Sequence, residues 1–175
     1  MELAPRAQRQ IIRRMEPLEP PALHQAQAAY GWLELGNAEE AFAELERLPE
    51  ELQLLPAVQA VRLDCLMAAK DWNAAVKLAQ VLCGQWAEEP GLWLHHAYAA
   101  RRCAGGSIEA AYELLAPCVE RFPEEWLIPY NVACYLCQME RLDEARAMLV
   151  MARSKGGERV DTMAKDDEDL APLNL

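Results

Sequence analysis

Four alanines recur along the chain at nearly constant intervals, and each stands in a stretch with helical periodicity. They are Ala41, Ala75, Ala111 and Ala145, and the intervals between them are 34, 36 and 34 residues. A helix that crosses its neighbour closely needs a small residue at the crossing point, and alanine meets that need. Because a fixed period of this length is typical of helical repeats, the spacing predicts stacked helical units that each bury the same position.

Each alanine belongs to an apolar stripe with the same spacing in every unit. The stripe begins three residues before the alanine and continues four and seven residues after it, which places its members on one helix face. A break of turn or polar residues precedes each stripe, so the pattern predicts four antiparallel helix pairs. The stripes are Ala38, Leu45 and Leu48; Trp72, Ala79 and Leu82; Ile108, Leu115 and Cys118; and Leu142, Leu149 and Ala152. The breaks are Gly36-Asn37, Lys70-Asp71, Gly105-Gly106-Ser107 and Glu140-Arg141.

Another helical segment lies upstream of each break. Pro56 and Pro90 are also 34 residues apart, and proline suits the first turn of a helix, where its missing N–H is not needed. In the second unit one face is formed by Val58, Val61, Cys65, Leu66 and Ala69. We therefore expect helical hairpins at about residues 21–55, 56–89, 90–123 and 124–154.

These units resemble the tetratricopeptide repeat family, whose pattern is W-x2-L-G-x2-Y followed by A-x3-F and P. The third unit carries Trp93, Ala97, Ala111, Leu115 and Pro123, and the first carries Ala29, Trp32, Gly36, Ala41 and Leu45. The fourth has Tyr130-Asn131-Val132-Ala133-Cys134-Tyr135 and Arg141-Leu142-Asp143-Glu144-Ala145. The second keeps Leu63, Leu66, Ala75 and Ala79 but places Arg62 where the family prefers an aliphatic residue. The resemblance implies an all-α fold, a right-handed α-α superhelix (solenoid) of about four such hairpins.

The two ends of the chain are expected to cap this array. Residues 1–20 contain Arg6, Arg9, Arg13 and Arg14 among apolar residues, and we interpret them as a basic capping helix; a membrane or nucleic-acid arm is the alternative. At the other end, residues 155–175, we expect a capping helix from about Glu158 to Leu170 that ends before Pro172. The acidic run with its Leu-Ala-Pro-Leu sequence also resembles the ending of some bacterial members of the family. In an alternative hypothesis this acidic segment lies in the binding groove against Arg101 and Arg102 until a partner displaces it.

Charge and hydropathy restrict the partner classes. The formal net charge is −11, whereas binding to nucleic acid requires a positive surface that releases counterions from phosphates. No apolar run approaches the roughly 18 residues of a membrane span, and the N-terminus lacks the pattern of a secretory signal. We therefore expect no nucleic-acid or membrane partner and a cytoplasmic location.

The six cysteines lie within helical apolar stripes, which favours buried free thiols over a disulfide framework. Cys134 and Cys137 form the C-x-x-C pair, and a zinc site there would need two further ligands, for which His95 and His96 on the preceding unit are candidates. A thiol or zinc sensor at this pair is an alternative function. The preferred prediction is no bound metal and no cofactor.

No catalytic motif is evident in the sequence. The histidines His24, His95 and His96 have no serine or aspartate at a recognisable motif spacing. Gly105-Gly106 lacks the following Lys and Ser/Thr of a phosphate-binding loop, so we interpret it as a turn insertion that explains the interval of 36 residues. The expectation is that the chain is not an enzyme.

The family resemblance implies that the first helix of each hairpin lines a concave groove that binds a peptide. Tyrosine and arginine often carry interface energy, which draws attention to Tyr98 and Arg101. The usual lysine and asparagine of a carboxylate clamp are replaced by Ala26 and Tyr30, which argues against a chaperone-tail clamp. The candidate groove residues are Tyr30, Asp64, His95, Tyr98, Arg101, Arg102, Tyr130 and Asn131, with Glu34, Met67, Cys134 and Gln138 on the same expected face.

The sequence thus predicts a non-enzymatic interaction module, an adaptor or scaffold that binds a protein or peptide segment. A secretion-type or assembly chaperone is the alternative within this class. Self-assembly into a homo-oligomer remains open, because the uncapped ends of a helical array stack on one another.

Overall fold

The computed structural model describes residues 18–174, and over that range the chain is entirely helical, with eleven α-helices, one 3-10 helix and no strand. The all-α prediction is therefore confirmed. The predicted N-terminal helix and its four arginines lie outside the described residues. Among the described helices, none combines the length and the apolar character that crossing a bilayer requires. The chain divides near His95 into two compact units, which are described separately.

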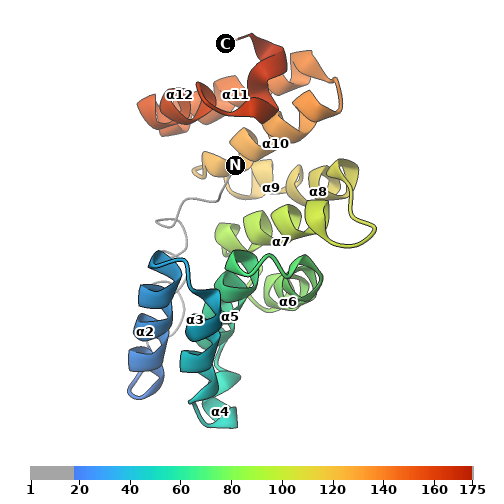
Figure 1. The fold of residues 1–175 in the computed structure, drawn as a ribbon. Coiled ribbons are helices and arrows are strands. Elements are labelled where there is room, and N and C mark those ends of the chain that lie inside the picture. Colours follow the sequence, from blue (N-terminus) through green and yellow to red (C-terminus); the bar gives the residue numbers. More distant parts are fainter. Residues whose placement is uncertain (1–17, 175) are drawn as a thin grey trace. The chain divides into compact units, whose positions relative to one another are not determined.

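The first unit contains α2 (Ala22–Glu34), α3 (Ala38–Glu46), α4 (Glu50–Gln53), α5 (Pro56–Ala68), α6 (Trp72–Gln85) and the start of α7 (Pro90–Arg102). Helices α2 and α3 lie side by side as a hairpin, and α5 packs on both of them (Figure 1). Helix α5 pairs in turn with α6. Both predicted proline starts are confirmed, because α5 begins at Pro56 and α7 at Pro90.

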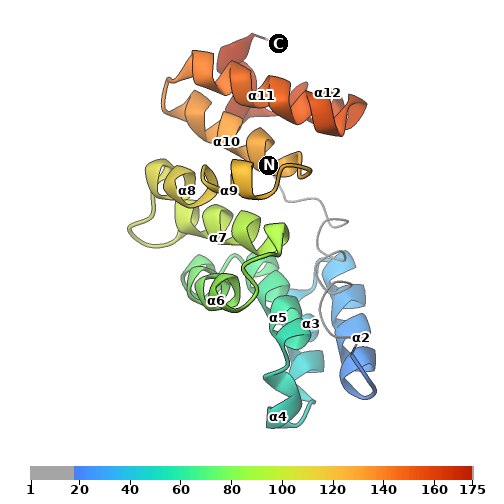
Figure 2. The same cartoon turned by 180° about the vertical axis from the view of Figure 1, so that it is seen from behind.

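The second unit contains the end of α7, α8 (Ile108–Leu115), α9 (Cys118–Arg121), α10 (Leu127–Gln138), α11 (Leu142–Gly156), α12 (Glu158–Ala164) and the 3-10 helix η1 (Glu168–Leu173). Helices α10 and α11 form an antiparallel pair, with α12 next to the end of α11 (Figure 2). Helix α10 also packs against α8 and, with α11, against η1. Eleven of its twelve residues, Leu127 to Cys137, are buried.

The repeating stripe is confirmed as buried around its four alanines, which lie on α3, α6, α8 and α11. All four alanines have an exposed fraction of 0%. The residues four and seven positions later are also buried in every unit, whereas the residues three positions earlier are half-buried. A larger side chain at any of the four alanines would have to displace packed neighbours, so the period in the sequence reflects a packing requirement.

The four predicted breaks share one backbone conformation. Gly36, Lys70, Gly105 and Glu140 all have positive φ, between 58° and 77°, the left-handed conformation that commonly ends a helix. In three of the four breaks the next helix then begins with a side-chain cap: Asn37, Asp71 and Ser107 each accept a hydrogen bond from the backbone N–H three residues later. Local chemistry therefore fixes where three of the four second helices start.

Two boundaries differ from the expectation. The third stripe was predicted to continue to Cys118 on one helix, but Pro117 separates α8 from α9, since a proline inside a helix lacks the N–H of the ladder. The capping helix expected over about Glu158 to Leu170 ends at Ala164, and the chain then forms η1, which contains Pro172. This second break turns residues 167–173 onto α10 and α11.

Candidate functional site

The eight predicted groove residues fall into two clusters, one in each unit. Tyr30, Asp64 and His95 come from α2, α5 and the start of α7 in the first unit. The other five lie in the second unit, on the end of α7 and on α10: Tyr98, Arg101, Arg102, Tyr130 and Asn131.

The first cluster is a polar network around the carboxylate of Asp64. The Tyr30 hydroxyl donates a hydrogen bond to Oδ2 of Asp64 at 2.8 Å. Nε2 of His95 lies 3.2 Å from Oδ1 of Asp64, but the two atoms do not have hydrogen-bond alignment, so the contact is an ion pair. Asp64 and His95 are only 3% and 2% exposed. Their burial differs from the expected solvent-facing position and leaves neither side chain able to contact a partner directly.

The geometry of His95 favours the protonated ring. Its Nδ1 is 2.7 Å from the backbone carbonyl oxygen of Gly91, so Nδ1 must carry hydrogen. A neutral ring would then present the lone pair of Nε2 to the Asp64 carboxylate. Burial alone lowers the pKa of His95, whereas Asp64 and the Gly91 carbonyl raise it, and the net pKa lies above the ordinary value. The network therefore ties α2, α5 and α7 together most strongly when His95 is charged.

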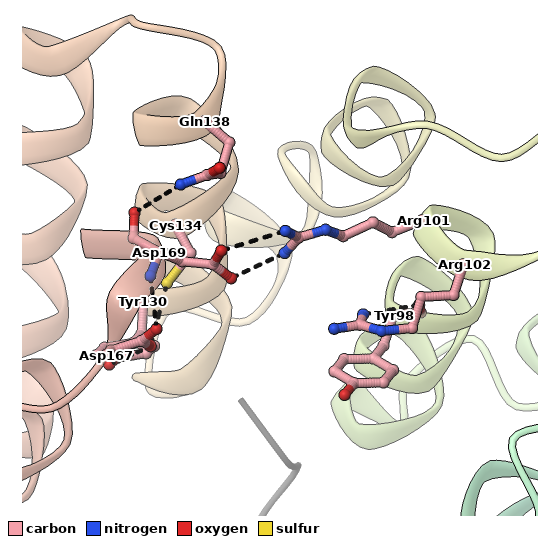
Figure 3. Close-up of polar contacts among 8 residues, drawn as sticks. All are labelled: Tyr98, Arg101, Arg102, Tyr130, Cys134, Gln138, Asp167 and Asp169. Atoms are coloured by element: carbon pink, nitrogen blue, oxygen red, sulfur yellow. Dashed lines mark hydrogen bonds and ion pairs between the residues drawn. The ribbon is translucent and has the colours of Figure 1, made fainter. Parts of the chain in front are cut away.

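The second cluster centres on Arg101 and the acidic segment, residues 166–173. The guanidinium of Arg101 donates two hydrogen bonds to Asp169, at 2.8 and 3.2 Å (Figure 3). The side-chain amide of Gln138 donates to the backbone carbonyl of Asp169 at 3.2 Å. The hydrogen bonds from Arg101 hold the pKa of the Asp169 carboxyl below its usual value and raise that of the guanidinium. This paired geometry is the most specific way in which arginine binds a carboxylate.

Tyr130 and Asp167 form the adjoining contact. The Tyr130 hydroxyl donates to Oδ2 of Asp167 at 2.8 Å, and the Cys134 thiol lies 3.7 Å from the same oxygen. Oδ1 of Asp167 accepts from the backbone N–H of Asp169, so Asp167 also caps η1. Tyr130 is fully buried. Burial and the Asp167 carboxylate raise the pKa of both Tyr130 and Cys134, which keeps both groups protonated as donors.

The remaining predicted residues have other contacts. The guanidinium of Arg102 stacks on the ring of Tyr98, 3.6 Å from its centroid, and donates to the Tyr98 carbonyl. Asn131 is buried and its amide donates to the carbonyl of Leu127 in its own helix. Of the two arginines that the sequence placed near the acidic segment, Arg101 therefore forms the ion pair, and Arg102 packs on Tyr98.

The C-x-x-C pair has the environment of core cysteines. Cys134 and Cys137 are buried, and burial is the main cause that raises the pKa of each thiol. A thiol with a raised pKa is a poor nucleophile because the thiolate is the reactive form. Within residues 18–174, no group of three or more His, Cys, Asp or Glu side chains is arranged to hold a metal ion.

Four residues define what we call the α7/α10 face: Arg101, Tyr130, Cys134 and Gln138. Each of them directs a polar atom to the acidic segment. No protein-family model, curated protein or solved structure matches the chain. The geometry of this face and the residues on it are therefore the basis for a functional argument.

The individual partners Asp167 and Asp169 were not singled out by the sequence. In the sequence, only the charge of the acidic run, opposite to that of Arg101, indicates a contact between them. All four acidic residues, 166–169, carry that charge equally, and the 3-10 turn directs the side chains of the second and the fourth, Asp167 and Asp169, toward α7 and α10. Spacing alone does not specify that turn, because it depends on the packing of Leu170 and Leu173, which are both buried.

Proposed function

We propose that the chain is a non-enzymatic interaction module that binds a segment of a partner protein on its α7/α10 face. The helical pairs would belong to a tetratricopeptide-like array, and their first helices would supply the binding residues. Arginine, tyrosine and glutamine side chains presented from rigid helices are well suited to hold a peptide, because they bind both its side chains and its backbone.

One observation carries the proposal: the α7/α10 face holds a short acidic segment by groups that the sequence assigned to peptide binding. Arg101 binds a side chain of the segment, Gln138 binds its backbone and Tyr130 binds a second side chain. Such a combination of backbone and side-chain contacts is how peptide-binding surfaces fix both the register and the identity of a ligand. The segment belongs to the chain itself, so it is a direct example of what the face accommodates.

The alternative functions lack a comparable observation. A sensor at Cys134 and Cys137 would require an accessible thiolate or further ligands, and both thiols are buried with raised pKa. A secretion-type or assembly chaperone would use the same face and is distinguished from an adaptor by its partner.

Site-specific photocrosslinking in cell extract tests the proposal. A photoreactive amino acid would replace Gln138, which is exposed and touches the segment, and in a matched control it would replace Val150, which is exposed on α11. We expect a partner adduct from position 138 and none from position 150. Equal adducts from both positions, or none from position 138, would contradict binding at this face.

A further inference from the structure

The acidic segment presents a defined set of side chains to the rest of the second unit. Asp167 and Asp169 are half-buried, and Leu170 and Leu173 are buried. The other residues of the segment, Asp166, Glu168, Ala171 and Pro172, are exposed. The contacting set therefore consists of two carboxylates two residues apart, followed by leucines one and four residues after the second carboxylate.

Each contact has a counterpart with matching chemistry. Asp169 meets the paired N–H groups of Arg101, and Asp167 meets the Tyr130 hydroxyl. The side-chain amide of Gln138 donates a hydrogen bond to the backbone carbonyl of Asp169. A segment that only capped the apolar face of α10 and α11 would need apolar side chains alone. The polar contacts of this segment therefore add a selectivity that a simple cap does not need.

From this complementarity we infer that the α7/α10 face binds a partner segment with the pattern Asp-x-Asp-Leu-x-x-Leu, and that residues 167–173 occupy the face as an internal mimic of it. This inference rests on the proposed function and specifies the ligand class, an acidic peptide segment with two leucines. The partner and the internal segment compete for Arg101, Tyr130 and Gln138, so binding of the partner requires release of η1.

A peptide without the two carboxylates would be a poor substitute. Tyr130 is buried, and its hydroxyl would lose its acceptor if Asp167 were displaced by an apolar group. The Arg101 guanidinium, one-fifth exposed as a side chain, would lose both of its hydrogen bonds to Asp169. These unmet groups select against apolar and basic segments and favour a ligand that restores both bonds.

The internal segment has features that suit exchange. It is a single six-residue 3-10 helix, a form with poorer hydrogen-bond geometry than an α-helix. Its ion pair lies at the rim, where Arg101 and Asp169 are each 20% exposed. Tethering nevertheless gives it an effective concentration on the order of mM, so a free peptide competes well only after the internal contacts are weakened.

The experiment weakens the internal segment without altering the face. The full chain would carry Asp167→Asn together with Asp169→Asn, and the matched control would carry Asp166→Asn together with Glu168→Gln, which changes the net charge equally at exposed positions. The probe is a fluorescein-labelled synthetic peptide of residues 164–175 with the natural sequence. Fluorescence anisotropy would measure its Kd for each chain, and circular dichroism would establish that each chain is folded.

We expect the Asp167→Asn/Asp169→Asn chain to bind the probe at least about tenfold more tightly than the unmodified chain. The apparent affinity is proportional to the fraction of molecules in which the internal segment does not occupy the α7/α10 face, and the two substitutions raise that fraction. The control chain should bind like the unmodified one. Adding Arg101→Gln to the double variant should abolish the gain. A probe with asparagine in place of Asp167 and Asp169 should not bind.

Failure of the probe to bind the folded double variant, or equal binding to all four chains, would overturn the inference. The proposed function is tested separately by the crosslink from position 138. If the crosslinked partner lacked the acidic pattern, binding at the α7/α10 face would stand and only the proposed ligand class would be wrong. If the double variant does not fold, the Asp169→Asn chain provides a second test, because it removes the ion pair with Arg101 and keeps the Asp167 cap of η1. It should bind the probe more tightly than the unmodified chain, and equal binding would overturn the inference.

Discussion

The buried pair of Asp64 and His95 depends on one proton. Because the folded pKa of His95 is raised above its unfolded value, the ion pair contributes its full stability below about pH 6.5, the ordinary pKa of histidine. That contribution is lost as the pH rises through the folded pKa. The pair therefore makes the first unit more stable in mild acid than at alkaline pH.

Replacing Asp64 by Asn tests this residue-scale account. Without the carboxylate, burial lowers the pKa of His95, so the loss of stability that the unmodified chain shows as the pH rises above about 6.5 should disappear. Urea unfolding across this pH range would measure it. Tyr30→Phe is the control, because it keeps the charged pair and should keep the slope; identical slopes for the unmodified and Asp64→Asn chains would contradict the ion pair.

Gly106 illustrates a backbone requirement at the same scale. A Cβ atom at this position would overlap the carbonyl oxygen of Ala100, which is backbone and cannot rotate away. We expect Gly106→Ala to lower the free energy of unfolding by about 1–3 kcal/mol. Gly84→Ala is the matched control, because Gly84 lies in the last turn of α6 and an added Cβ would meet no atom within 4 Å other than its chain neighbours and the helix's own backbone. It should not lower the free energy of unfolding. Thermal unfolding of both variants would check the difference, and equal effects would contradict it.

At the scale of elements, η1 is held by an ion pair to Arg101 on α7, by hydrogen bonds from Tyr130 and Gln138 on α10, and by the burial of its two leucines. The Arg101–Asp169 pair joins residues 68 positions apart in sequence, so it couples the end of α7 to η1. An ion pair with two aligned hydrogen bonds and partial burial is worth more than a fully exposed one.

A double-mutant cycle with Arg101→Gln and Asp169→Asn should give a coupling free energy of about 1 kcal/mol in urea unfolding. The comparison is Arg141 with Glu144, a more exposed pair three residues apart at the start of α11, whose coupling should be smaller. Since the pKa of Asp169 is lowered by Arg101, the coupling should be present at neutral pH and fade as the pH falls through that pKa. A coupling near zero at pH 7 would mean that Arg101 does not hold the segment.

The elements differ in how far the sequence predicts them. Ala41 and its three equivalents are small because helices cross there, so a local pattern revealed both the stripe and the helix that carries it. Pro117 breaks a helix by its missing backbone N–H, a local signal that the apolar stripe does not reveal. The break at residues 165–167 depends instead on how η1 packs, so periodicity predicts neither break. Among the site residues, the helix faces of Arg101 and Tyr130 follow from periodicity, whereas the burial of Asp64 and Asn131 depends on neighbouring helices that the sequence leaves unspecified.

At the scale of the whole molecule, the two units use the predicted groove residues differently. The first unit buries Asp64 and His95 in a network that joins three helices, and the second directs Arg101, Tyr130 and Gln138 to a peptide-like segment. The net charge of −11 disfavours close approach of other acidic surfaces, so a partner segment with aspartates must be recognised by local contacts. The α7/α10 face offers such contacts through Arg101 and Tyr130.

The central claim is that this face binds a partner protein. Its most direct test is a calorimetric titration of a synthetic peptide that matches the partner's crosslinked segment. The peptide would be titrated into the unmodified chain and into the Gln138→Ala, Arg101→Glu and Val150→Ala chains. We predict that Gln138→Ala and Arg101→Glu each lower the affinity by about 1–3 kcal/mol while the circular dichroism is unchanged, and that Val150→Ala has no effect. Intact folding with unchanged affinity in both the Gln138 and the Arg101 variants would contradict the claim.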